Sequence, residues 1–220
     1  MPVYTLMPQT LSNPPEHLVS LWQRKQPARL LIGLAGQPGS GKSTIARHWR
    51  EAMRIAHPEL PMQVLGMDGF HLSRSQLAAL PDPDAAFARR GAPWTFDAAG
   101  FVAKVAALRA DAGMVKWPDF DHSVGDPEPD ALQVGPAVRV VLVEGLYLLY
   151  REGDWAGLNG LFDECWFLDT DPTLALERLL VRHQQAWGFS REQALARYRS
   201  NDGLNAGLVR HTRQRADWLV

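Results

Sequence analysis

Short, continuously apolar runs alternate along this chain with longer stretches in which apolar residues recur every three or four positions. The apolar runs predict strands over 28–35, 62–68, 137–145 and 164–170, with a fifth at 216–220. The periodic stretches predict helices over 14–25, about 41–56, 97–110 and 171–185. Apolar strands that alternate with helices are typical of a parallel sheet covered on both faces. The pattern therefore predicts an α/β fold of three layers, α/β/α, with a mostly parallel central sheet.

Three of the predicted strands end in residues that can carry chemistry. The first runs into a glycine-rich loop at Gly36, the second ends at Asp68 and the third reaches Glu144. In open parallel sheets, ligands bind beyond the carboxyl ends of the strands. We therefore expect the chemistry of this protein at that edge of the sheet.

Two stretches rich in proline, glycine and charge, 80–94 and 116–130, interrupt this order. Both look too irregular for helices or strands, and long loops in compact domains are usually functional or disordered. Because both combine aromatic residues with paired charges, we expect functional loops.

The composition narrows the classes of partner. The chain has 220 residues, of which 46% are apolar and 21% charged, with a formal net charge of −1. A chain of this length suits one domain over 1–220, with an N-terminal arm and helix over 1–28. The near-zero net charge offers no polycationic surface for nucleic acid. No apolar run reaches the length of a membrane span, no signal peptide is visible, and the single cysteine, Cys165, suits a reducing compartment. We expect a cytoplasmic protein whose partners are small molecules.

The loop after the first strand gives the strongest chemical signal. It reads GQPGSGKST and comprises Gly36, Gln37, Pro38, Gly39, Ser40, Gly41, Lys42, Ser43 and Thr44. GxxxxGK[ST] between a strand and a helix is the P-loop pattern, in which backbone N–H groups surround phosphates at a helix N-terminus. We expect Lys42 to reach the β- and γ-phosphates and Ser43 to place its hydroxyl on Mg²⁺.

Glu144 follows four consecutive apolar residues in VVLVEG. That position suits a carboxylate that holds the Mg²⁺ of a P-loop site, directly or through water. The alternative is an ordinary loop acid, but an acid directly after a buried strand is poorly placed to be merely solvated.

Other P-loop classes lack their signatures here. No asparagine lies in an NKxD-type segment of a GTP switch, and the LSGGQ-like segment of transporter ATPases is missing. What remains is phosphoryl transfer to a small acceptor, hydrolysis of ATP without an acceptor, or a nucleotide-sensing regulatory protein.

Several segments together resemble one superfamily. GQPGSGKST, MDGFH, FDHS, VVLVEG, the arginine-bearing helix after FLDTD and the closing TRQRADWLV look like the P-loop kinases of the uridine kinase, phosphoribulokinase and pantothenate kinase superfamily. RRGAPWTFDAAGF and FDHSVGDPEPDA are similar to its bacterial branch labelled "putative fructose transport system kinase". The resemblance covers the chain from about Arg29 and is specific for the superfamily, not for the acceptor.

In similar kinases, the acid that ends the second strand takes the proton of the acceptor hydroxyl, and the matching residue is Asp68. Physical reasoning agrees, since a carboxylate opposite the phosphate loop can orient a hydroxyl in line with the γ-phosphorus. The alternative is that Asp68 only turns the chain before Gly69.

The resemblance also implies acceptor-binding residues. Arg89, Arg90, Trp94 and Phe96 fall where related kinases close a flap over the acceptor, and FDHS matches an acceptor-binding region. The candidates are His71, Arg90, Trp94, Asp121 and His122. His71 has an alternative role as a cap of the next helix, and the arginines as a surface pair beside a core tryptophan. An arginine that follows the family's T-H-S has no clear counterpart here.

The helix over 171–185 carries Arg178 and Arg182 four residues apart, on one face. In the family, the matching helix and turn form a small helical lid, here about 178–200, whose arginines stabilise charge on the transferring phosphoryl group. The closing segment resembles the adenine side of the site and puts Arg215 near the base or ribose. Asn201 and Asn205 are candidates for polar contacts there or for capping and turn roles.

The sequence therefore predicts a kinase that depends on ATP and Mg²⁺ and phosphorylates a hydroxyl of a sugar, nucleoside or pantothenate-like metabolite. Asp68, Lys42 and Arg182 are its catalytic candidates. Binding of nucleic acid or membrane is not expected, and a homodimer is left open.

Overall fold

The computed structural model describes residues 8–110, 113–121 and 124–220, and not the side chain of Asp121. Its central sheet has six strands, all parallel, in the order β1-β8-β7-β2-β6-β3. The strands are β1 (Gln9–Thr10), β2 (Leu30–Ala35), β3 (Met62–Gly66), β6 (Val140–Gly145), β7 (Glu164–Phe167) and β8 (Trp218–Leu219). The five predicted strands are confirmed; β1, only two residues long, was not predicted because it is too short to show a pattern.

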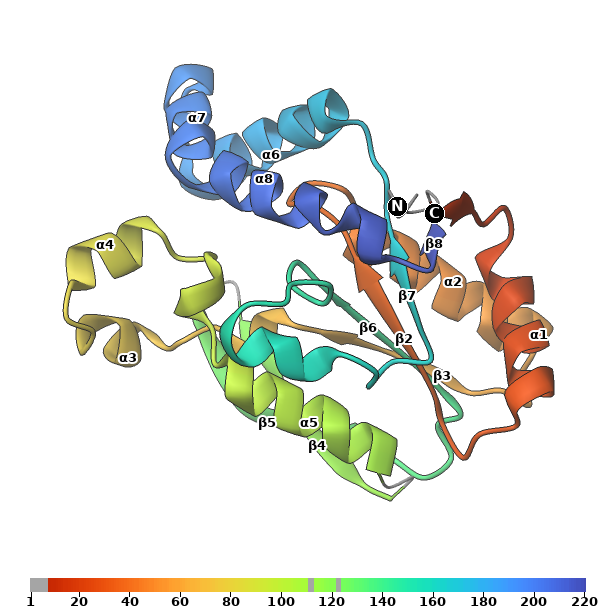
Figure 1. Ribbon diagram of the computed structural model, residues 1–220. Helices are drawn as coiled ribbons and strands as arrows, with labels where there is room; N and C mark the ends of the chain where they lie inside the picture. The colour runs from red at the N-terminus through yellow and green to blue at the C-terminus, as the bar shows by residue number, and fades with distance from the viewer. Residues whose placement is uncertain (1–7, 111–112, 122–123) are drawn as a thin grey trace, which may run out of the picture.

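The sheet is covered on both faces, which confirms the three-layer α/β/α prediction (Figure 1). Strand β2 shows how: Leu30, Ile32 and Leu34 pack with α1 (Pro14–Lys25) and α2 (Lys42–Ala56). On the other face, Leu31 and Ala35 belong to the cluster that holds α5 (Ala98–Ala110) and the 3₁₀ helix η3 (Gly153–Leu158). Because every residue of β2 is buried, the strand had to be continuously apolar.

The predicted helix starts are also confirmed. The Asp97 carboxylate accepts a hydrogen bond from the Gly100 N–H at the start of α5. Asp171 caps α6 (Pro172–Trp187) by accepting from the N–H groups of Thr173 and Leu174. A carboxylate at this position satisfies N–H groups that lack a partner within the helix.

The prediction that 116–130 is irregular is wrong. The segment forms most of an antiparallel hairpin, β4 (Val115–Asp121) and β5 (Asp126–Val134), whose register shifts between Trp117 and Asp119. The prolines that suggested a loop are tolerated because the two strands form a separate sheet with free edges. Trp117 anchors the hairpin: its ring is fully buried and its indole N–H donates to the Gly66 carbonyl at 2.9 Å.

The stretch 80–94 is also more regular than predicted. It contains α4 (Pro83–Ala88), with Asp82 as N-cap and Pro83 in the first turn, and the 3₁₀ helix η2 (Pro93–Thr95). Together with α3 (Arg74–Ala78) these segments project from the sheet, on the left in Figure 1. We call residues 74–96 the flap.

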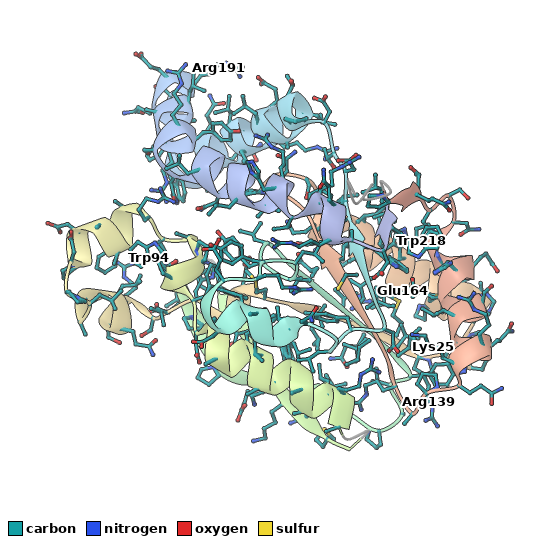
Figure 2. All side chains as sticks on the ribbon, viewed as in Figure 1. Lys25, Trp94, Arg139, Glu164, Arg191 and Trp218 are labelled. Atoms are coloured by element: carbon teal, nitrogen blue, oxygen red, sulfur yellow. The ribbon has the colours of Figure 1, made fainter. Side chains whose placement is uncertain are left out.

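Above the carboxyl edge of the sheet, α6 packs with α7 (Arg191–Arg197) and with a π-helical turn at Tyr198–Asp202, which leads into α8 (Gly203–His211), as Figure 1 shows. Figure 2 labels Arg191 at the outer tip of this layer, where its guanidinium pairs with Glu177. Among the residues that the structure describes, no helix is both long and apolar enough to cross a bilayer.

Candidate active site

The glycine-rich loop connects β2 to α2, as predicted. Gly39 and Gly41 have φ angles of +77° and +94°, which other residues adopt only with strain. A Cβ atom on Gly39 would overlap the carbonyl oxygen of Ala175 in α6. The loop is therefore held against α6 as closely as backbone allows.

Lys42 begins α2 and is buried. Its ammonium donates to the carbonyl oxygens of Gly36 and Gln37, at 2.9 and 3.2 Å. Burial lowers the pKa of this ammonium, whereas Glu144 and Asp68 act in the opposite direction. The lysine is thus a cation inside the loop, stabilised by two carboxylates.

Glu144, near the end of β6, lies beside the start of α2. Its Oε1 accepts a hydrogen bond of 2.7 Å from the Ser43 hydroxyl. Burial raises the pKa of the Glu144 carboxyl, and Lys42 opposes this rise. Parallel pairing sets the position, because Glu144 lies opposite Leu34 of β2 and Gly66 of β3.

Asp68 begins a 3₁₀ turn, η1 (Asp68–Phe70), two residues after β3. Its side chain is exposed and makes no hydrogen bond to the described residues. It lies close enough to Lys42 and Glu144 to influence the pKa of both. Two carboxylates from adjoining strand ends therefore lie within electrostatic range of the loop lysine.

Two arginines of α6 face the same loop. Arg178 donates to the Ser40 carbonyl at 2.9 Å, and Arg182, one turn further, contributes to the electrostatic lowering of the Lys42 pKa. Both line a pocket of about 220 Å³. Its remaining walls are Gly39, Gly41, Lys42, Ser43, Thr44 and Leu179. The pocket thus combines three cations, two hydroxyl side chains and a helix N-terminus, which is chemistry suited to phosphates.

The oxygen donors suit Mg²⁺. The Ser43 hydroxyl and the Glu144 carboxylate are hard oxygen ligands, which Mg²⁺ prefers in small number. No group of three or more His, Cys, Asp or Glu side chains able to hold a metal exists within 8–110, 113–121 and 124–220. An Mg²⁺ ion here would complete its shell with phosphate oxygens and water.

The predicted acceptor residues fall around η1 and the flap. The His71 Nδ1 donates to the Asp68 carbonyl at 2.9 Å, and its ring stacks on Phe96 with centroids 4.0 Å apart. His71 is not a helix cap; Ser73 caps α3. Trp94 is 51% exposed on η2, where Figure 2 labels it.

Other candidates lie apart from the loop pocket or cannot be placed. Arg215, in η5 (Arg213–Arg215), donates to the Leu149 carbonyl at 3.0 Å and does not line that pocket. His122 and the Asp121 side chain lie outside the described part of the chain.

Gln37 and Ser40 connect the loop to neighbouring elements. Gln37 donates to the Thr170 carbonyl and accepts from Arg210 of α8. Thr170 in turn donates to the Ser40 carbonyl at 3.0 Å.

Sequence reasoning missed Tyr147. This buried residue, three positions after Glu144, donates from its hydroxyl to the Gly91 carbonyl at 2.6 Å and so ties the flap to the carboxyl end of β6. Burial raises the pKa of Tyr147; Arg89 opposes the rise, and Asp202 and Asp68 add to it. The only signal in the sequence was an aromatic residue shortly after a strand-ending acid.

Known proteins resemble this chain over most of its length. The family described as "Phosphoribulokinase / Uridine kinase family" matches residues 31–220. "Uncharacterized protein YggC" of Escherichia coli K12 is 33% identical over 214 residues, covering 96% of this chain and 86% of that protein. "Putative uridine kinase C227.14" of Schizosaccharomyces pombe is 36% identical over 187 residues, covering 84% and 80%.

Solved structures agree with these matches. The crystal structure of a "putative fructose transport system kinase" from Silicibacter sp. TM1040 superposes with a TM-score of 0.84 at 33% identity, covering 94% of this chain and 96% of that one. YFH7 of Saccharomyces cerevisiae, described as a "putative P-loop containing kinase with a circular permutation", superposes with a TM-score of 0.80 at 23% identity, covering 94% and 96%. The second likeness concerns the fold alone.

Proposed function

Because the chain belongs to the phosphoribulokinase/uridine kinase family of P-loop kinases, we propose that it transfers the γ-phosphoryl group of ATP to a hydroxyl of a small metabolite. The acceptor class is a sugar, a nucleoside or a pantothenate-like molecule. The names of two relatives contain different substrates, uridine in one and fructose in the other, so they do not identify the acceptor class of this chain.

One observation carries the proposal. Asp68 lies near the loop lysine, and its carboxylate makes no hydrogen bond to any described residue. A loop that only bound nucleotide would not need a second acid there, since Glu144 already accepts the hydrogen bond of the Ser43 hydroxyl. An exposed carboxylate beside the phosphate pocket can orient a hydroxyl in line with the γ-phosphorus.

The proposed reaction assigns each residue a step. Lys42 leaves the Gly36 and Gln37 carbonyls and donates to the β- and γ-phosphates. The acceptor oxygen bonds to the γ-phosphorus, the bond to the bridging oxygen of ADP breaks, and the hydroxyl proton passes to Asp68. Arg182 and Arg178 stabilise charge on the transferred group. Ser43 and Glu144 would hold Mg²⁺, which neutralises phosphate charge when bound.

We also propose that residues 178–200 act as a lid over the phosphate pocket. Residues 178–200 comprise most of α6 and all of α7, so the two arginines that reach the loop lie at its start. Movement of this segment would bring Arg182 onto the transferring group and exclude water, which favours transfer over hydrolysis.

The test is a screen for ADP release with a panel of sugars, nucleosides and pantothenate-like acids, using the wild type and Asp68→Asn. We expect release that depends on one class of acceptor, and a loss of about 10²- to 10⁴-fold in Asp68→Asn with ATP affinity unchanged. Asp154→Asn, an exposed acid on η3, is the matched control. Full transfer by Asp68→Asn would overturn the assignment of the base, and ADP release that ignores every acceptor would favour a hydrolase.

A further inference from the structure

The turn after α4 is fixed from three sides. The Arg90 carbonyl accepts from the Asn201 amide at 2.8 Å, and the Gly91 carbonyl accepts from the Tyr147 hydroxyl at 2.6 Å. The Gly91 N–H donates to the Thr95 hydroxyl at 2.9 Å. The backbone that carries Arg89 and Arg90 is therefore held in place before any ligand binds.

Most of the Arg90 guanidinium is engaged within the protein, although its Nε is buried without a hydrogen-bond partner. Its guanidinium donates to the carbonyls of Gly125 and Leu72, approaches Asp126 at 3.4 Å and lies over the Phe120 ring. These contacts join the flap to the β4–β5 hairpin. Arg90 thus acts as a structural clamp.

The guanidinium of Arg89 makes fewer contacts than that of Arg90. One nitrogen, Nη2, donates to the Asn205 side-chain oxygen at 3.1 Å. Its Nε, like that of Arg90, is buried without a hydrogen-bond partner, and its Nη1 makes no hydrogen bond to any described residue. Since buried or half-buried cations are normally paired, these unused donors need an explanation.

No carboxylate pairs with Arg89 among the described residues, where the ion pairs involve other groups. Asp202 influences the same Tyr147 hydroxyl as Arg89, but the ion-pair contact of its carboxylate is with the His183 ring, at 3.4 Å, and not with Arg89. The contact that Arg89 does make is to an amide that is itself buried: Asn205, 2% exposed, which donates to Asn201, 1% exposed. The two asparagines orient the guanidinium and leave its charge uncompensated.

Arg89 also lies toward the proposed base. The Tyr147 hydroxyl donates to the Gly91 carbonyl, two residues after Arg89, and the Tyr147 ring packs against Phe96 with centroids 5.7 Å apart. Phe96 in turn packs against His71, whose Nδ1 donates to the Asp68 carbonyl. One chain of contacts therefore joins the turn that carries Arg89 to the proposed base. Arg178 and Arg182, by contrast, line the loop pocket. The unpaired charge at Arg89 is thus separate from the cations assigned to ATP.

We propose that Arg89, oriented by Asn205 and Asn201, binds an anionic group of the acceptor, a carboxylate or a phosphate, while Asp68 receives the hydroxyl. This inference rests on the proposed function and narrows it: the substrate is a hydroxylated acid or a phosphorylated polyol, not a neutral sugar or nucleoside. A guanidinium suits both anions because it donates several parallel hydrogen bonds.

The experiment compares acceptors that differ only in the anionic group: glycerol, glycerate and glycerol phosphate, and in parallel a hexose, its aldonic acid and its phosphate. We expect transfer to anionic members, and the better anion distinguishes a carboxylate site from a phosphate site. Arg89→Gln should raise the KM for the anionic acceptor about 10- to 100-fold, as expected for hydrogen bonds to a charged group. ATP affinity should not change, and the exposed Arg50→Gln is the matched control.

Two further variants distinguish loss of anion binding from a merely structural effect. Asn205→Asp keeps the side-chain shape but gives Arg89 a carboxylate partner, so it should also raise the KM for the anionic acceptor. Arg89→Lys keeps a positive charge and should restore part of the affinity that Arg89→Gln loses. Equal use of neutral and anionic acceptors, unaffected by Arg89→Gln, would overturn this inference and leave the kinase proposal intact. An equal loss for all acceptors would also overturn it, whereas no transfer to any compound would count against the proposed function itself.

Discussion

Lys42 is held in the loop by backbone carbonyls, and its charge is balanced by Glu144 and Asp68 at a distance. Phosphate oxygens would be stronger acceptors for the same ammonium. Lys42→Ala should therefore weaken ATP binding by about 10- to 100-fold, the value of hydrogen bonds to a charged group. Calorimetric titration measures this, with the exposed Lys116→Ala as control. An unchanged affinity for ATP would contradict the assignment of the loop.

Cys165 illustrates a residue whose environment removes its reactivity. Burial raises the pKa of its thiol to about 12, with Asp217 adding to the rise. Because the thiolate is the reactive form, the native protein should resist iodoacetamide at pH 8 and react promptly in denaturant. Mass spectrometry of both samples checks this, and rapid modification of the native protein would show that β7 opens to solvent.

The phosphate loop lies so close to α6 that adding a single methyl group to the loop tests the contact. Gly39→Ala places a Cβ against the Ala175 carbonyl at a φ of +77°. Gly160 provides the matched control, since it has a φ of +78° and a Cβ added there would meet nothing within 4 Å.

We expect Gly160→Ala to cost only the backbone strain, about 1–3 kcal/mol. Gly39→Ala should cost more and should also weaken ATP binding, because the loop must move away from α6. Urea unfolding and ATP titration of both variants separate strain from collision. Equal effects of the two substitutions would mean that the loop has room to move away from α6 without loss.

The elements that sequence predicted well are those set by local pattern. The buried strand Leu30–Ala35 and the capped helix Pro172–Trp187 depend on apolar runs and on cap residues that are visible in the chain. The hairpin over 115–134 was missed because its prolines hide the alternation, although its two strands follow one another directly in the chain. Prolines exclude a central strand but not an edge strand.

The candidate site was predictable to a similar extent. Lys42, Ser43 and Glu144 follow from motifs, and they meet as expected. The adjacent residues Arg89 and Arg90 could not be told apart, because their roles depend on Asn205 and on Gly125 in remote segments. No local rule states which of two neighbouring arginines the tertiary structure will use.

One carboxylate at the amino edge of the sheet, opposite the proposed site, contacts a helix of each layer. Asp163, just before β7, accepts from the Leu31 N–H at 2.9 Å, from Arg109 of α5 at 3.0 Å and from Lys25 of α1 at 3.2 Å. Its side chain is only 7% exposed. The acid thus joins a strand to one helix on each face of the sheet.

This network gives stability a defined dependence on pH. Burial alone would raise the pKa of Asp163, but the hydrogen bonds from Arg109, Leu31 and Lys25 outweigh it and lower the pKa below its usual value of 3.8. The folded state therefore favours the ionised form. Its contribution is complete above the unfolded-state pKa, near 4, and is lost as the pH falls through the lower folded-state pKa.

Asp163→Asn should consequently reduce the free energy of unfolding by about 1–3 kcal/mol at pH 7, because two cations and an N–H lose a charged acceptor. The difference from the wild type should shrink as the pH falls below about 4, because the unfolded wild-type chain then takes up a proton at Asp163 before the folded state does. Urea unfolding at pH 7 and at pH 3 measures both values, with Asp154→Asn as the exposed control. A difference that stays constant between the two pH values would mean that shape, not charge, holds the two helical layers to the sheet.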